Sequence, residues 1–481
     1  MIDKKFVIDA VDSISARINR LGDDVWDHPE TAFTEYRSAA LHIEALKELG
    51  FEVQENLADI PTAFSGRWGS GRPVIGILGE FDALSGLSQE AGLAEHKPVI
   101  PGGNGHGCGH NLFGAASIGA AYAVKEYLKA SGMSGTVIYF GCPGEEGGSG
   151  KAFMARDGVF DGLDAALAWH PAAGNQVWSD PFLGNFQVKY KFNGIAAHAG
   201  ACPELGRSAL DAVELMNVGV QYLREHIISD ARIHYAVTDT GGFSPNVVQA
   251  HAEVLYLIRA PKLDQVREIY DRVNHIAHGA AEMTGTSVEI EFIKACSNFV
   301  PNTVLNEVMQ ANMEEIGAPK FDEADHALAK ALNETVKVSG AGFAEQLRQF
   351  PKEVREELMR HAGDDIYDFV MPLSRIEKQV TASTDVGDVS WICPTAQVGI
   401  CTMASRTPGH AWQLVAQGKS GIAHKGTVYA AKVMAGSAVD ILNDPELLKK
   451  AKEEHEERLD HQKYVPPIPK GVRPQALQKK K

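Results

Sequence analysis

The clearest indication of the fold is Val74-Ile75-Gly76-Ile77-Leu78, a short apolar run that leads into Gly79-Glu80-Phe81-Asp82. Two similar runs, residues 136–140 and 165–169, also end just before polar side chains. Each has the length and composition of a buried strand, and the segments between them have helical patterns. We therefore expect strands and helices to alternate from residue 51 to residue 170. This alternation is typical of an α/β fold with a mostly parallel sheet covered by helices.

A different pattern follows this first part of the chain. Strand patterns cover residues 186–192, 232–237, 253–259 and 287–293, with helical patterns at 207–225 and 263–283. The order βαββαβ predicts an inserted α+β unit of the split-βαβ, ferredoxin-like kind. We expect a catalytic domain in two parts, residues 1–184 and 295–481, interrupted by a lid or dimerisation domain at 185–294. The polar stretch 305–374 contains no motif that indicates a role.

Composition narrows the functional classes. The chain has 481 residues, which favours two or more domains, and its 46 basic against 62 acidic residues give a formal charge of -16. Such an acidic balance argues against a nucleic-acid partner. No apolar run approaches the roughly 18 residues of a membrane span, and the N-terminus lacks the features of a signal peptide. The six cysteines of the chain are scattered, without the spacing of a disulfide framework. We therefore expect no membrane partner and a cytoplasmic location.

Metal-ligand residues follow the predicted strands. The run Gly105-His106-Gly107-Cys108-Gly109-His110-Asn111 comes between two of them, Gly144-Glu145-Glu146 follows the second, and Trp169-His170 closes the third. In open α/β sheets, ligands gather beyond the carboxyl ends of the strands. A thiolate, imidazoles and adjacent carboxylates at that edge predict a site for two divalent metals and a base, and hence a hydrolase.

The residue types suggest a division of roles. Cys108 is the candidate for a ligand shared by both ions, because a thiolate can bridge two metals as a carboxylate does. The other predicted ligands are His110, Glu146 and His170. A fifth should come from the C-terminal half, where His410 and His424 compete. We favour His410, because it lies in a loop after an apolar run, whereas His424 lies where the final helix could begin.

The two adjacent carboxylates should act differently, because neighbouring side chains diverge. We expect Glu146 to bind metal and Glu145 to act as the general base. Asp82 could orient a ligand imidazole, although a helix N-cap is the alternative role. The glycine-rich run 144–151 also resembles a phosphate-binding loop, but five residues lie between its glycines, Ala152 replaces the Ser or Thr, and two acids would face the phosphates.

Several motifs together resemble the M20 metallopeptidase and amidohydrolase family: GEFDAL, GHGCGHN, PGEEGGSGK, AWHP, GIAAHA and SPNVVQAHAEVLYLIRA. Because Cys108 stands at the bridging position, the chain is similar to the aminoacyl amidohydrolase branch of this family. The resemblance implies the same five metal ligands and the same base. One departure is Glu80, which stands where many members have a metal-binding His, so that His110 must supply that imidazole.

The resemblance also implies roles for the inserted unit. His198 would stabilise the tetrahedral oxyanion, often across a dimer interface, while Asn246 and Arg259 would hold the carbonyl and the α-carboxylate of the substrate. It implies two divalent ions, with thiolate ligation favouring Zn and the family favouring Mn. The partners implied are a second copy of the chain or a related A subunit, bound through the inserted unit.

The activity that the resemblance implies is hydrolysis of the amide in an N-acyl amino acid. The leading substrate is p-aminobenzoyl-glutamate, a folate breakdown product. A dipeptidase or another N-acyl amino acid amidohydrolase is the enzymatic alternative. A further alternative is a partner-dependent subunit with little activity alone.

Overall fold

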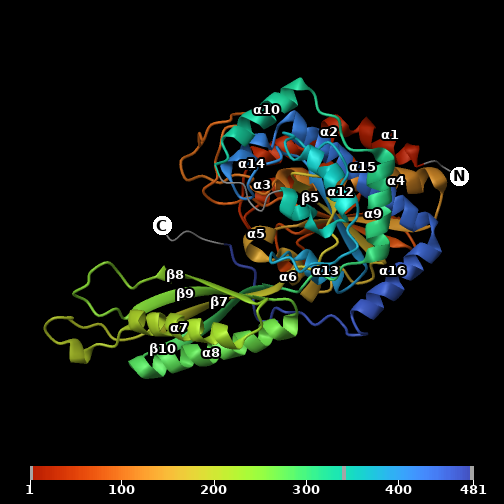
Figure 1. Ribbon diagram of the computed structural model, residues 1–481. Coiled ribbons are helices and arrows are strands. Elements are labelled where there is room, and N and C mark those ends of the chain that lie inside the picture. The colour runs from red at the N-terminus through yellow and green to blue at the C-terminus, as the bar shows by residue number, and fades with distance from the viewer. Residues whose placement is uncertain (1–3, 338–342, 477–481) are drawn as a thin grey trace.

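The central feature of the computed structural model, which describes residues 4–337 and 343–476, is a seven-stranded sheet (Figure 1). Its order is β1-β2-β4-β3-β5-β11-β6. The strands are β1 (Glu52–Glu55), β2 (Phe64–Ser70), β3 (Val74–Glu80), β4 (Gly135–Cys142), β5 (Ala165–Ala172), β6 (Gln176–Val177) and β11 (Thr395–Cys401). The neighbours β4, β3, β5 and β11 are parallel, while β1, β2 and β6 pair antiparallel at the edges. The predicted fold class is confirmed.

Two long helices rich in small residues pack on this sheet. The long helices α4 (His110–Ser131) and α15 (Gly421–Asn443) pack against each other and against the central strands. The others are α1 (Lys5–Ser13), α2 (Ser15–Trp26), α3 (Tyr36–Glu48), α5 (Glu145–Gly148), α6 (Gly150–Arg156), α9 (Thr303–Ile316), α10 (Glu323–Glu334), α11 (Phe343–Gln346), α12 (Lys352–Leu358), α13 (Val386–Ser390), α14 (Trp412–Gln417) and α16 (Pro445–Arg458). In the described part of the chain, no helix has both the length and the apolar character that crossing a membrane requires.

A second sheet, four-stranded in the described residues, projects from the main body in Figure 1. All its neighbours are antiparallel, in the order β10-β7-β9-β8. Its elements are β7 (Gly184–Asn193), α7 (Ala209–Leu223), β8 (Arg232–Asp239), β9 (His251–Ala260), α8 (Leu263–Thr284) and β10 (Ser287–Cys296), which is the predicted βαββαβ order. Alternate β7 side chains, Phe186, Val188, Tyr190 and Phe192, are buried, and α7 and α8 pack on this sheet.

The chain passes between the two sheets twice, and both connections form hydrogen bonds to the segment that precedes β11. At the first crossing, the Leu183 amide donates to the Ala382 carbonyl at 3.0 Å. At the second, the Ser297 amide and hydroxyl donate to the Asp388 carboxylate at 3.0 and 2.8 Å. The base of the second sheet is thus fixed to α13. The exact domain limits remain a prediction.

Candidate active site

The predicted ligands come from neighbouring strands of the central sheet. Cys108 and His110 lie where α4 begins, Glu146 lies in α5 directly after β4, and His170 lies near the end of β5. The sequence pattern placed His170 just after its strand, but the strand continues through it to Ala172. These side chains meet because β3, β4 and β5 are parallel, so that their carboxyl ends share one edge.

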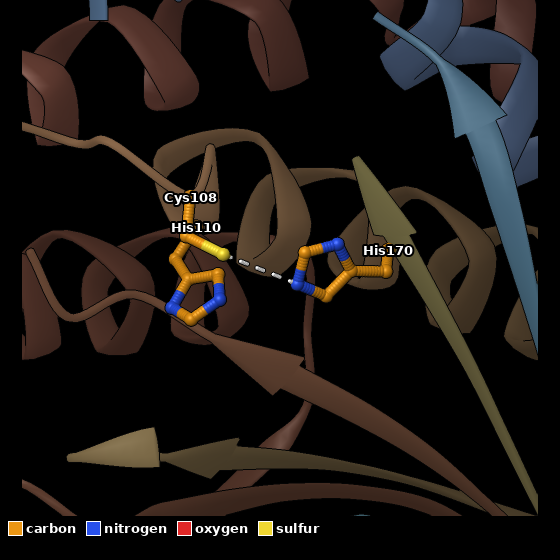
Figure 2. Close-up of side chains that lie close together, drawn as sticks. All are labelled: Cys108, His110 and His170. Atoms are coloured by element: carbon orange, nitrogen blue, oxygen red, sulfur yellow. Dashed lines mark hydrogen bonds between the residues drawn. The ribbon is translucent and has the colours of Figure 1, made fainter. Parts of the chain in front are cut away.

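Cys108 belongs to two groups of ligand atoms. One contains Cys108, His110 and His170, and the other contains Cys108, Glu146 and His410; within each group, the atoms lie within 4.8 Å of one another. The Cys108 Sγ is 3.5 Å from His170 Nε2, as Figure 2 shows. In the second group, His410 Nε2 is 3.3 Å from Glu146 Oε1. This is the arrangement that two ions sharing one thiolate require.

The local backbone explains how Cys108 and His110 face the same site. Gly109 between them has φ of 77°, a left-handed conformation that favours glycine. A Cβ built on Gly109 would also lie 2.8 Å from the Pro171 Cβ. Helix α4 starts at His110, directly after this glycine. The glycine allows a sharp turn, and both ligands sit on it.

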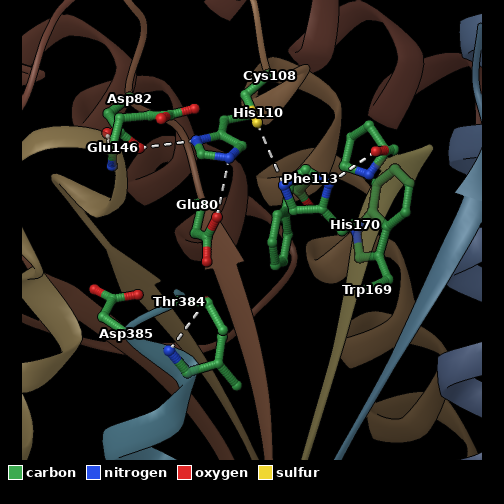
Figure 3. Close-up of polar contacts among 12 residues, drawn as sticks. Glu80, Asp82, Cys108, His110, Phe113, Glu146, Trp169, His170, Thr384 and Asp385 are labelled. Atoms are coloured by element: carbon green, nitrogen blue, oxygen red, sulfur yellow. Dashed lines mark hydrogen bonds and ion pairs between the residues drawn. The ribbon is translucent and has the colours of Figure 1, made fainter. Parts of the chain in front are cut away.

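Hydrogen bonds fix the orientation of both imidazoles. His110 Nδ1 donates to Asp82 Oδ1 at 2.9 Å, and His170 Nδ1 donates to the Pro171 carbonyl at 2.7 Å. Because the Nδ1 atoms carry the hydrogens, the Nε2 lone pairs are left for the cluster. Asp82 also accepts from the Glu146 amide at 2.9 Å, so that one carboxylate holds ligands from two loops (Figure 3).

The site fits divalent cations. His110 Nε2 and Glu146 Oε1 are buried, and neither makes a well-aligned hydrogen bond; their polar contacts include Glu80 Oε2 at 3.2 Å and His410 Nε2 at 3.3 Å, respectively. Such unpaired buried atoms cost roughly 1–3 kcal/mol each, and a coordinated cation would remove that cost. Burial, reinforced by the Glu146 charge, raises the pKa of the Cys108 thiol. The thiolate form needed for bridging would therefore depend on bound metal.

The adjacent carboxylates Glu145 and Glu146 have opposite environments. Burial, with the carboxylates of Glu80 and Glu146, raises the pKa of Glu145 well above its usual value. Burial alone would also raise the pKa of Glu146, but the polar contact with His410 and the His110 charge lower it to about 2. The two side chains diverge, since Glu145 groups with Glu80 and His110 instead. Environments of this kind give two adjacent carboxyl groups different proton affinities.

The two candidate histidines of the C-terminal half lie in different places. The amide of His410 donates to the Gly107 carbonyl at 3.0 Å, which brings its ring to Glu146. His424 lies inside α15, which begins at Gly421, and its Nε2 is 2.9 Å from Asp23 Oδ1. The structure thus brings His410, and not His424, to the ligand cluster.

The three residues expected to bind substrate lie on the second sheet and its loops. His198 is exposed, and its Nδ1 accepts from the amides of Gly200 and Ala201 at 3.2 and 3.1 Å, which leaves Nε2 free to donate. The Asn246 carbonyl accepts from the Ala199 amide at 2.9 Å, so Asn246 lies beside His198. Arg259 donates to the Thr381 carbonyl at 3.4 Å. Among the described residues, none of the three joins the ligand groups.

Two buried residues at the site, Lys151 and Asp385, were not among the predicted site residues. The Lys151 ammonium pairs with Glu80 and with Asp385, at 2.5 and 2.6 Å. In the sequence, Lys151 follows a glycine-rich turn and had suggested only a phosphate loop. The complete burial of its side chain, which sequence patterns do not show, is the feature that distinguishes it.

Known proteins with related sequences define the family to which this α/β chain belongs. The chain belongs to peptidase family M20/M25/M40, whose model matches residues 76–472. It is 49% identical over 477 residues to the B subunit of the p-aminobenzoyl-glutamate hydrolase of Escherichia coli K12, covering 98% of this chain and 99% of the relative. The A subunit of that organism's hydrolase is 28% identical over 342 residues, 61% of this chain and 77% of its own.

The fold is also that of solved family members. A dinuclear metal-binding M20 peptidase of Bacillus subtilis superposes with a TM-score of 0.56 at 17% identity, covering 90% of this chain and 99% of its own. The resemblance that the motifs suggested is therefore confirmed at the level of family and fold.

Proposed function

We propose that this protein hydrolyses the amide bond of N-acyl amino acids, with p-aminobenzoyl-glutamate as its substrate, to give p-aminobenzoate and glutamate. The observation that carries the proposal is the pair of ligand groups sharing Cys108, with Glu145 beside them. Support for the substrate comes from the 49% identity to one subunit of a p-aminobenzoyl-glutamate hydrolase over almost the whole chain. We propose two divalent ions, Mn or Zn, as cofactors, held by Cys108, His110, Glu146, His170 and His410.

The residues of the active site have different roles in the proposed reaction. When bound, the cations would supply Lewis-acid polarisation of the scissile carbonyl and of the attacking water. Glu145 takes a proton from that water and returns it to the leaving amine. Asp82 keeps the His110 ring in the tautomer that presents Nε2. Glu146, with its lowered pKa, stays ionised as a ligand.

The second sheet supplies the substrate contacts in this proposal. His198 Nε2–H and the Asn246 amide stabilise the oxyanion. The Arg259 guanidinium pairs with the α-carboxylate of the glutamate product side, because its fork meets a carboxylate in two parallel hydrogen bonds. These groups must reach a cluster that lies on the other sheet, which favours either closure of the second unit or delivery of His198 by a partner chain.

An exposed apolar surface supports association with a partner chain. On α7, Val218 and Tyr222 are 52% and 73% exposed, and on the edge strand β8, Tyr235 and Val237 are 42% and 41% exposed. An unpaired edge strand beside apolar side chains is a common association surface. We propose that this surface pairs with a second copy or with a related A subunit. The unpaired cysteines of the chain fit the reducing cytoplasm that we propose as its location.

The test is a substrate panel measured on the purified, metal-loaded chain. p-Aminobenzoate release from p-aminobenzoyl-glutamate, absent in Glu145→Gln, supports the proposal. Faster cleavage of dipeptides or of simple N-acetyl amino acids would replace the substrate but keep the site. Activity that appears only when a related A subunit is present would show that the chain works as half of a complex. No hydrolysis of any amide, with two metals bound and either subunit composition, would refute the proposal.

A further inference from the structure

A lysine that the proposed reaction does not use is buried beside the active site. The Lys151 side chain is 0% exposed, and its ammonium contacts the Glu80 and Asp385 carboxylates at 2.5 and 2.6 Å. The Lys151 amide also donates to the second Asp385 oxygen at 2.9 Å. Asp385 therefore holds both ends of this residue, while Glu80 is held through one oxygen alone.

The other oxygen of Glu80 points into the site. Glu80 Oε2 is buried without a hydrogen-bond partner and lies 3.2 Å from His110 Nε2, the nitrogen that faces the ligand cluster. Figure 3 shows the Glu80 carboxylate facing the His110 ring, with Asp385 on its other side. The ligand-atom groups place Glu80 with His110 and Glu145, and not with Cys108. The carboxylate is thus next to the cation position, but is held outside the shared-thiolate groups.

The charges in this arrangement depend on one another. Two buried carboxylates face one ammonium, and removing one member of a buried ion pair leaves an uncompensated charge. Without the ammonium, a cation bound at His110 would attract the Glu80 carboxylate, whose Oε2 already lies 3.2 Å from His110 Nε2. Glu80 is the last residue of β3, so the sheet fixes its backbone. Only its side chain would rotate toward the cation.

We propose that Lys151 is a positioning residue of the active site, which, anchored by Asp385, keeps the Glu80 carboxylate beside His110 and Glu145 and off the cation. The unit Glu80–Lys151–Asp385 thereby keeps the coordination position next to His110 free for the reaction. This inference rests on the proposed function, and it assigns a role to a buried carboxylate that the proposed reaction does not use.

Two double variants with the same net charge test the proposal. Lys151→Met with Glu80→Gln removes the ammonium and the carboxylate that it restrains. Lys151→Met with Asp385→Asn removes the ammonium and the distant carboxylate, so that Glu80 is released. Each loses one positive and one negative buried charge, which matches their cost of folding. Lys125→Met is the control for losing a largely buried ammonium elsewhere, since Lys125 pairs with Glu126 at 2.6 Å.

The readouts are the visible spectrum of the Co²⁺-loaded protein and the rate of hydrolysis. We expect Glu80→Gln with Lys151→Met to keep the wild-type Co²⁺ spectrum, and Asp385→Asn with Lys151→Met to change that spectrum and to lower the rate of hydrolysis about 10–100-fold, the size of effect seen when the support of a ligand is removed. Equal behaviour of the two double variants, or the reverse order, would overturn the proposal. The spectrum needs no substrate, so a failure of the proposed substrate would leave this test valid.

Discussion

The His410 imidazole lies 3.3 Å from the Glu146 carboxylate, although one comes from the loop before α14 and the other from the turn after β4. The polar contact with the Glu146 carboxylate raises the pKa of His410 against the effect of burial. The C-terminal part of the chain thereby completes a cluster whose other members all come from the first half. This relationship is what distinguishes a two-cation site from a one-cation site.

His410→Ala should lose one of two bound divalent ions and more than about 100-fold in rate, because the loss of a ligand should cost at least as much as the loss of its supporting partner. His424→Ala is the matched control, since His424 pairs with Asp23 at 2.9 Å within α15 and should keep both ions. The number of metal ions that remain bound to each variant after gel filtration, measured by mass spectrometry, tests this prediction. Two ions retained in His410→Ala would exclude it as a ligand.

Glu145→Gln should lower kcat by about 10²–10⁴-fold, the usual contribution of a positioned general base. The variant should still bind both cations, because the Glu145 oxygen lies outside the two groups that share Cys108. Glu146→Gln provides the contrast and should lose metal together with activity. If Glu145→Gln lost a metal ion and Glu146→Gln did not, the roles of the two carboxylates would have to be exchanged.

If His198 acts across an interface between chains, two inactive variants should restore each other. Glu145→Ala and His198→Ala, mixed and allowed to exchange subunits, should recover about a quarter of wild-type activity, because half of the random dimers contain one complete site. The exposed position of His198, away from the ligand groups, motivates the experiment. A mixture as inactive as its components, with exchange shown by differently labelled subunits, would indicate that His198 acts within its own chain.

The Asp388 carboxyl should make stability depend on pH. Burial raises its pKa to about 7, despite hydrogen bonds from Ser297, so the folded protein binds its proton more tightly than the unfolded chain does. Its contribution is complete below about pH 4 and is lost as pH rises through about 7, a difference of about 4 kcal/mol. Relative to wild type, Asp388→Asn should therefore gain stability between about pH 5 and about pH 8 in urea unfolding. A parallel pH dependence of the two proteins would contradict this assignment.

The sequence predicts those elements whose side-chain periodicity reflects burial. β3 and β5 lie where apolar runs indicated buried strands, and β7 to β10 lie where alternation indicated an inserted sheet. The edge strand β1 was not predicted, because its Glu52–Glu55 side chains are mostly exposed and polar. The start of α4 at His110 depends on the left-handed Gly109, which hydrophobic periodicity does not register.

The ligand cluster was predictable to the extent that reactive residues follow strands. Cys108, His110, Glu146 and His170 follow from that rule. Lys151 does not, because its role depends on burial between Glu80 and Asp385, which come from distant parts of the chain. The position of His198 relative to the cluster depends on how chains associate, and the sequence of one chain contains no direct signal for it.

We propose that this chain hydrolyses p-aminobenzoyl-glutamate with two cations that share Cys108 and with Glu145 as base. The most direct measurement titrates the metal-free, reduced chain with Mn²⁺ or Zn²⁺ while glutamate release is followed, alone and with a related A subunit. We predict activity that reaches its plateau at about two equivalents of metal and is absent in Cys108→Ala and Glu145→Gln. Full activity at one equivalent, or undiminished activity in Cys108→Ala, would contradict the account.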